Sequence, residues 1–172
     1  KPTISPPETV SRNFTRKVWP DYAIVMKKSL LNCALFKDMT AAEVESALAM
    51  CPHTVGSYSK GDIIALKDSR YISLIIISAG SVSAETTDRS QNRLKLERIN
   101  APALIAPSHL FAENNRLPVN LSARNVVSTL HIERDDFADM IGHHRQIMVN
   151  FLEIISSSNR FISENVVYLT YK

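Results

Sequence analysis

Residues 71–88 read YISLIIISAGSVSAETTD, and this stretch decides the class of fold. The segment from Ile72 to Ile77 is short, apolar and β-branched, which is typical of a buried strand. Gly80 marks a turn, and the residues after it alternate so that Val82 and Ala84 share one face. The pattern therefore predicts two consecutive strands of a β-structure.

Further strand signals lie on both sides of this pair. In HTVGSYSKGDIIALKD, residues 53–68, a KGD turn precedes a strand marked by Ile63, Ile64 and Leu66. RLKLERI, residues 93–99, alternates so that Leu94, Leu96 and Ile99 face inward, and residues 123–134 form one more apolar strand. Many short strands broken by Gly and Asx turns, without a crossover helix, predict a small barrel or jelly roll.

Helical patterns flank the strands. Apolar residues recur at helical spacing over residues 27–36, and TAAE at 40–43 is a capping box that opens a helix ending before Pro52. After the last strand, residues 134–143 form a short helix with acidic residues in its first turn. The fold class expected is therefore mainly β with flanking helices.

A long helix closes the chain, because residues 144–171 contain neither Gly nor Pro. One stripe has the seven-residue spacing of a coiled coil and predicts a dimer interface: Met148, Leu152, Ile155, Asn159, Ile162, Val166 and Leu169. A second stripe contains Ile147, Phe151 and Ile154. A helix with two apolar faces must bury both of them. We expect one face to pack on the barrel and the other on a twin helix, and Asn159 to fix the register of the resulting parallel homodimer. The alternative is a long helix buried within one domain.

The order of these elements resembles the sensor half of the Crp/Fnr family of bacterial transcription regulators. Four segments carry the resemblance: YSKGDII at 58–64, IISAGSV at 76–82, HIERDDFADMI at 131–141 and SENVVYL at 163–169. It implies a cyclic-nucleotide-binding-like double-stranded β-helix over residues 26–142, with Phe137 closing the barrel base, and a dimerisation helix over 143–172. Residues 1–25 are expected to be an extension or leader.

The resemblance also implies a DNA-reading helix-turn-helix after the long helix. The sequence ends where the hinge to that module is expected, so DNA contact is expected only through a missing C-terminal module. The expected function is therefore effector sensing and dimerisation in the cytoplasm, without catalysis.

Residues 106–125, APSHLFAENNRLPVNLSARN, occupy the place of the family's ligand cassette. Cyclic-nucleotide binders of this family use a Phe-Gly-Glu triplet and an Arg-x-Ala segment for the ribose and the phosphate. With the alignment set on Ser122–Ala123, Pro107 falls on the Glu position, and a proline side chain cannot accept a hydrogen bond. Arg116 lies one place early. We therefore expect an unknown small-molecule effector other than a cyclic nucleotide.

The candidate ligand-binding residues come from this cassette and the long helix. They combine apolar lining with a few polar groups, as a small, partly apolar acid requires: Ser108, His109, Leu110, Phe111, Asn114, Arg116, Leu117, Val119 and Ser163. The alternative is a ligand-free dimerisation or scaffold domain, in which the pocket is collapsed and Asn114–Asn115 form only a turn.

Other chemistry has little support in the sequence. The net charge is +3, and the Lys and Arg residues do not form a cluster of the kind that binds DNA. Cys33 and Cys51 lack metal-ligand spacing and lie in apolar patterns, so core cysteines are expected. His143 and His144 are adjacent and point apart on a helix, so neither a metal nor a cofactor is expected. No nucleophile elbow or P-loop is present, and the longest apolar segments are too short to span a membrane.

Overall fold

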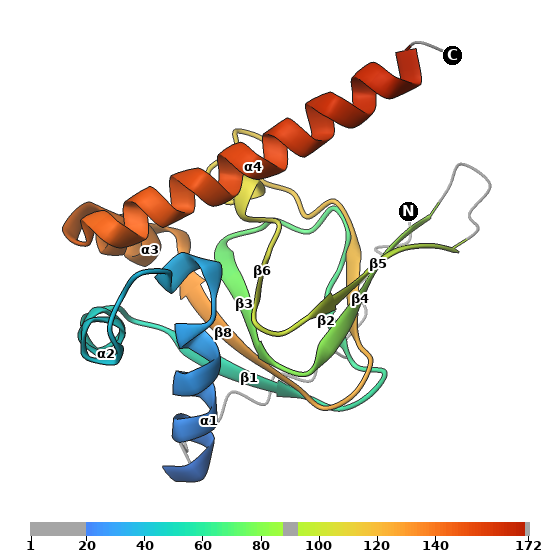
Figure 1. Ribbon diagram of the computed structural model, residues 1–172. Coiled ribbons are helices and arrows are strands. Elements are labelled where there is room, and N and C mark those ends of the chain that lie inside the picture. The colour runs from blue at the N-terminus through green and yellow to red at the C-terminus, as the bar shows by residue number, and fades with distance from the viewer. Residues whose placement is uncertain (1–19, 88–92, 171–172) are drawn as a thin grey trace, which may run out of the picture.

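The computed structural model describes residues 20–87 and 93–170, with side chains described over 26–86 and 97–158. Its centre is a roll of two antiparallel four-stranded sheets, flanked by helices at one end (Figure 1). The prediction of a jelly roll with flanking helices is confirmed.

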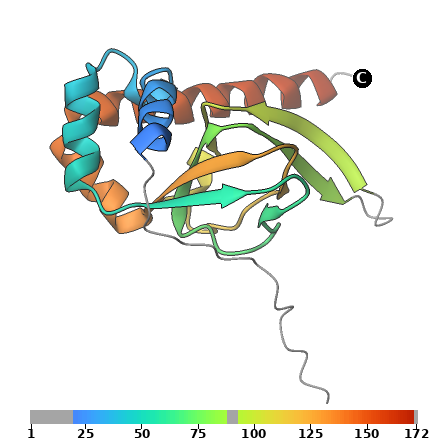
Figure 2. The same cartoon turned by 90° about the horizontal axis from the view of Figure 1, so that it is seen from below.

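The two sheets are built from eight strands. One sheet has the order β1-β8-β3-β6 and the other the order β2-β7-β4-β5. Their bounds are β1 Thr54–Tyr58, β2 Ile63–Ala65, β3 Ser73–Ala79, β4 Ser81–Thr87, β5 Arg93–Asn100, β6 Ala103–Ile105, β7 Asn120–Ala123 and β8 Val127–Glu133. Strands β1 and β2 are outermost in different sheets, and Figure 2 shows the roll from below, with β1 on the near side.

Strand β3 is apolar on both faces because both faces are covered. Leu74, Ile76 and Ile77 have no exposed surface, and α1, Pro20–Leu31, contacts this strand. At the β3–β4 turn Gly80 has a φ of +85°, and a Cβ there would lie 2.3 Å from the Val126 carbonyl oxygen. Only glycine fits this turn without displacing the backbone.

The N-terminal helices differ from the sequence expectation. Helix α1 begins at Pro20, so it crosses residue 26, where we expected the domain to begin. It ends at Leu31, and a 3-10 turn η1, Ala34–Phe36, replaces the expected continuation because Cys33 is extended. Burial of Leu35 and Phe36, both without exposed surface, accounts for this change of direction.

The remaining helices follow the predicted pattern. Helix α2, Ala41–Met50, begins with the capping box of Thr40 and Glu43, and it is followed by Cys51 and Pro52. Helices α3, Arg134–His143, and α4, Arg145–Thr170, follow the last strand. Both cysteines are buried and free, as expected. Among the described residues, no helix combines the length and the apolar character needed to cross a bilayer.

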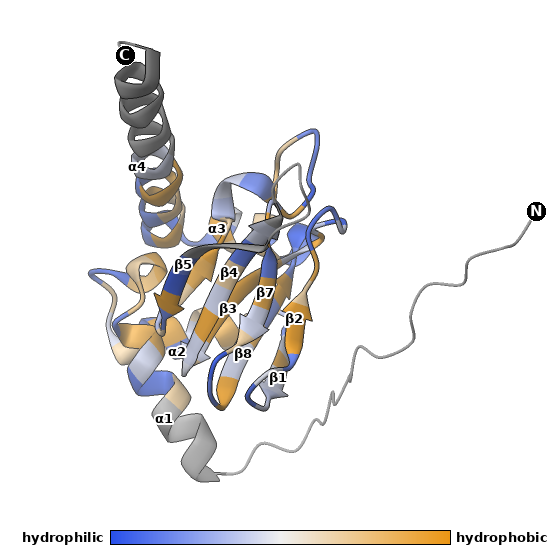
Figure 3. Ribbon diagram, turned by 90° about the vertical axis from the view of Figure 1, so that its right-hand side faces the viewer, coloured by the Kyte–Doolittle hydropathy of each residue, from blue (hydrophilic) through white to orange (hydrophobic). Residues whose placement is uncertain are grey.

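Helix α4 lies against the roll on one face only. Ile147 and Phe151 are buried in the core, whereas Met148 is 37% and Leu152 51% exposed. In this part of the helix, the stripe of Ile147 and Phe151 thus faces the core, and Met148 and Leu152 of the other stripe are exposed. The helix then continues beyond the roll (Figure 1), and the side chains predicted for its distal part, Asn159, Ile162, Ser163, Val166 and Leu169, lie outside the described side chains. In Figure 3 the coloured first part of α4 carries both apolar and polar residues.

Candidate functional site

The predicted cassette lies between β6 and β7 and begins with a short 3-10 turn, η2, Pro107–His109. Ala106 before the turn is left-handed, with a φ of +39°. Ser108 and His109 are partly buried, and their side chains approach within 3.4 Å, between Oγ and Nδ1. The turn contacts α4, so the start of the cassette adjoins the long helix.

The apolar residues of the cassette pack into the core. Leu110 has no exposed surface, Leu117 has 1%, and Val119 packs against the same cluster. Leu110 and Leu117 thus belong to the hydrophobic core and Val119 packs against it, and their contact with a ligand stays a prediction.

Phe111 joins an aromatic cluster that connects the cassette to both C-terminal helices. Its ring centroid lies 6.2 Å from that of Phe137 and 6.0 Å from that of Phe151. The guanidinium of Arg134 lies 5.6 Å from the centroid of Phe111, on the exposed side of the cluster. Phe137 is fully buried, in agreement with its expected position at the barrel base.

The polar residues of the cassette bond to the segment before β3. Arg116 Nη1 donates to the Asp68 carbonyl oxygen at 2.6 Å, and its backbone N–H donates to the Asn114 carbonyl oxygen at 2.9 Å. The Asn115 carbonyl accepts from the Tyr71 N–H at 2.6 Å. Asn114 and Arg116 therefore form a turn fastened to residues 68–71, and one guanidinium donor of Arg116 is already engaged.

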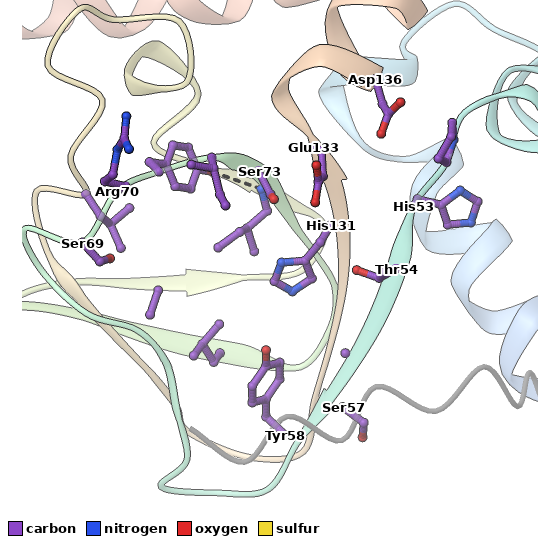
Figure 4. Close-up of a pocket in the computed structure, with 18 residues that line it drawn as sticks. His53, Thr54, Ser57, Tyr58, Ser69, Arg70, Ser73, His131, Glu133 and Asp136 are labelled. Carbon is purple, nitrogen blue, oxygen red and sulfur yellow. Dashed lines mark hydrogen bonds between the residues drawn. The ribbon is translucent and has the colours of Figure 1, made fainter. Parts of the chain in front are cut away.

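A different part of the molecule contains a cavity of about 600 Å³ (Figure 4). Its lining includes residues of both β1 and β2, and we call it the side cleft. Of the predicted ligand residues whose side chains are described, Leu117 alone lines it. The lining also includes Tyr58, Ile64, Arg70, Tyr71, Ile75, His131, Glu133 and Asp136.

His131 is one of the titratable groups that line this cavity, and its pKa is lowered. Its Nε2 lies 2.8 Å from the hydroxyl oxygen of Thr129, the inward-facing neighbour on β8. Burial lowers the pKa of His131 to about 4, so the imidazole is neutral near pH 7. Sequence reasoning missed this residue, although the alternation of β8 places it in phase with the inward-facing Thr129.

Tyr71 connects the side cleft to the cassette. Its hydroxyl donates to the Ile105 carbonyl oxygen, just before η2, and accepts from the Ile75 N–H at 3.0 Å. Burial raises the pKa of this phenol well above its ordinary value. The Tyr71 side chain is therefore held in place between the side cleft and the start of the cassette.

Within the described residues, no three His, Cys, Asp or Glu side chains gather as metal ligands. His143 is bound through Nδ1 to the Asp139 carbonyl at 2.7 Å.

No protein-family model and no curated protein sequence matches the chain. Solved structures do match. A transcriptional regulator from Thermotoga maritima is 26% identical with a TM-score of 0.69, over 75% of this chain and 98% of that one. The catabolite activator protein of Thermus thermophilus is 17% identical with a TM-score of 0.71, over 80% of this chain and 63% of that one.

The sensor domain of the transcriptional regulator DNR from Pseudomonas aeruginosa is 14% identical with a TM-score of 0.67, over 84% of this chain and 95% of that one. These are regulatory proteins, in agreement with the expectation of a domain without catalysis. Over most of its length the chain therefore matches the cyclic-nucleotide-binding-like sensor domains of Crp/Fnr-family transcription regulators.

Proposed function

We propose that the chain is the effector-sensing and dimerisation domain of a cytoplasmic Crp/Fnr-type regulator, and that its effector is a small molecule other than a cyclic nucleotide. The effector contacts the cassette, and the response is passed along α4 to a DNA-binding module. The chain spans 63% of the catabolite activator protein that it matches, so the activity of a whole regulator is part of this proposal.

The observation that carries the proposal is the contact between Phe111 and Phe151. One ring belongs to the cassette and the other to α4, and their centroids are 6.0 Å apart in an edge-to-face arrangement. Phe111 is 37% exposed, so a ligand can reach it, whereas Phe151 is 4% exposed. A ligand that binds better to one position of Phe111 than to another shifts the equilibrium between the corresponding orientations of α4. The shift in free energy is at most the difference between the two binding free energies.

The identity of the cassette residues supports exclusion of cyclic nucleotides. Pro107 stands at the position of the ribose-binding Glu in the alignment and offers neither a carboxylate nor an amide N–H. Arg116 is exposed and engaged with the Asp68 carbonyl. A cyclic phosphate would lack the paired arginine, which is worth about 1.5–3 kcal/mol as a charge-assisted bond.

Thermal unfolding with and without ligands tests the sensing proposal. A metabolite panel that includes cyclic AMP and cyclic GMP is expected to contain at least one small molecule that raises the unfolding temperature, whereas the two cyclic nucleotides do not. Phe111→Ala is expected to abolish that shift while Val126→Ala, at an exposed site on another surface, preserves it. A panel in which no molecule raises the unfolding temperature would favour the alternative, a ligand-free scaffold domain. The burial of Leu110 and Leu117 is compatible with that alternative.

The exposed side of α4 supports dimerisation. Met148 and Leu152 are separated by one helical turn and are exposed next to the buried Ile147 and Phe151. Ile155 is half-buried at the edge of the core, one turn further along. The predicted interface thus begins on a surface that this chain leaves partly uncovered, and a parallel twin helix would cover it.

Sedimentation velocity tests the dimer. Met148→Glu combined with Leu152→Glu places charges on the exposed stripe and is expected to give a monomer. Ser157→Glu, an exposed position on the opposite side of the helix, is the control and is expected to remain dimeric. A dimer that persists in the double variant would show that this stripe is not the interface.

A further inference from the structure

The side cleft is a cavity that the cassette does not form. Its lining comes from the edge strands of the two sheets, β1 and β2, and from β3 and β8. At about 600 Å³ it falls within the usual size range of small-molecule sites. Of the predicted ligand set, Leu117 is the one member with a described side chain on its wall.

The interior of the cleft combines apolar walls with one hydrogen-bonding ring. Ile64, Ile75 and Leu117 line it together with the side chains of Tyr58 and Tyr71. Aromatic and branched aliphatic walls favour a flat, apolar ligand, because burial of its surface is the main gain and aromatic rings stack on one another.

His131 projects into this space from β8 (Figure 4). Its Nε2 is occupied by the Thr129 hydroxyl at 2.8 Å. Among the hydrogen bonds of the described residues, none uses its Nδ1. A half-buried imidazole with one ring nitrogen unused by the described residues can bind one polar group of a ligand, and its neutral state suits an uncharged partner.

The charges at the mouth select against anions. Glu133 and Asp136 line the rim, and neither is in an ion pair with another described residue. The one arginine of the lining, Arg70, directs its guanidinium away from the centre of the cleft (Figure 4). An anionic ligand would therefore approach two uncompensated carboxylates before it reached the imidazole.

We propose that the side cleft binds a small, uncharged aromatic molecule that carries one hydrogen-bonding group, with that group on Nδ1 of His131 and the aromatic body against Ile64, Ile75 and Leu117. This site goes beyond the proposed function, since most of its described lining lies outside the cassette. Leu117 of the cassette lines it, and the lining residues Ser69, Arg70 and Tyr71 are bonded to the cassette through their backbones.

A charge series of equal shape tests the ligand class by isothermal titration calorimetry on the full chain. The probes are 2-naphthalenemethanol, 2-naphthylmethylamine and 2-naphthoate. The alcohol is expected to bind most tightly, and the naphthoate at least tenfold more weakly. Tightest binding of the naphthoate or of the amine, or no binding of the alcohol, would overturn the proposal.

Three variants locate the bound alcohol. His131→Leu removes the hydrogen bond and Ala65→Phe fills the cleft, so each is expected to weaken binding about tenfold or more. His109→Leu makes the same exchange in the cassette and is expected to leave the affinity unchanged. Loss of binding in His109→Leu alone would place the ligand in the cassette, which would overturn this site and leave the proposed function intact.

Nuclear magnetic resonance of the unaltered protein provides a readout that does not depend on the folding of a variant. The alcohol is expected to shift the His131 Nδ1 resonance and to leave that of His143 unchanged, because His143 lies on α3 outside the cleft. An unchanged His131 resonance at saturating alcohol would contradict the proposal.

Discussion

The side-chain amide of Asn150 in α4 donates to the backbone carbonyl of Leu35 in η1 at 2.9 Å, across 115 residues of sequence. The same nitrogen donates to the Lys37 carbonyl at 2.8 Å, and Asn150 is 2% exposed. These two bonds fasten the long helix to the N-terminal turn, next to the buried Phe151.

Replacement of Asn150 by Leu should cost about 1–3 kcal/mol of unfolding free energy, because both carbonyls lose their donor in a buried place. Urea unfolding followed by circular dichroism measures it. Gln146→Leu is the control, since Gln146 is exposed and bonds only to Asn150 Oδ1. If Asn150→Leu lost no more unfolding free energy than the control, the hydrogen bonds of Asn150 would contribute little to stability.

His131 should make the protein lose stability in mild acid. Its pKa is about 4 in the folded chain and about 6.5 when unfolded, so between these values the unfolded state binds more protons. The unfolding free energy is expected to fall by roughly 3 kcal/mol as the pH drops from about 6.5 to 4, and this contribution is fully present above that window.

Urea titrations at several pH values, compared between the unaltered chain and His131→Leu, measure this contribution. The variant should have a flatter profile between pH 4 and 6.5, whereas His143→Leu, at an exposed position, should keep the original slope. If the unfolding free energy of the unaltered chain and of His131→Leu changed equally with pH, His131 would not be the cause of the loss of stability in acid.

Replacement by alanine should change the stability of the protein in opposite directions at two glycines. Gly80→Ala is expected to destabilise by more than about 2 kcal/mol, since its φ is +85° and a Cβ would lie 2.3 Å from the Val126 oxygen. Gly142→Ala meets nothing within 4 Å in α3 and is expected to stabilise by about 0.5–1 kcal/mol. Thermal unfolding of both variants checks the pair, and a stable Gly80→Ala would show that the turn can rearrange.

Cys51 and Cys33 should react slowly with a thiol reagent at pH 8. Burial, followed by the nearby Asp136 and Asp139 charges, raises the pKa of Cys51 to about 11, and burial raises the pKa of Cys33. Modification by a disulfide reagent is expected to be slow in buffer and fast in denaturing urea. Rapid labelling of the folded chain would show that one of these segments opens readily.

The strands and caps were predictable because their signals are local. Gly80 marks its turn, Thr40 and Glu43 form their capping box, and the alternation after residue 81 matches β4. The end of α1 was not predictable in the same way. Residues 27–36 keep a helical spacing, but burial of Leu35 and Phe36 against the roll favours a break at Cys33.

The candidate site was harder to predict because its residues come from distant segments. The sequence indicated the cassette, yet Leu110 and Leu117 have packing roles and Arg116 is bound to Asp68. His131 and Tyr58 meet in the side cleft only because β1 and β8 pair, with Tyr58 opposite Val127. No short motif contains both residues, so no local pattern reports the cavity.

The sequence by itself determined the succession of short strands along the chain, the turn at Gly80 and the two-faced character of α4, because backbone conformation and apolar periodicity are properties of neighbouring residues. The tertiary structure decided which face of α4 is buried, since Ile147 and Phe151 find the core while Met148 and Leu152 do not. It also decided that His131 is neutral and lines a cavity, because desolvation depends on everything packed around the ring, and most of that comes from elsewhere in the chain.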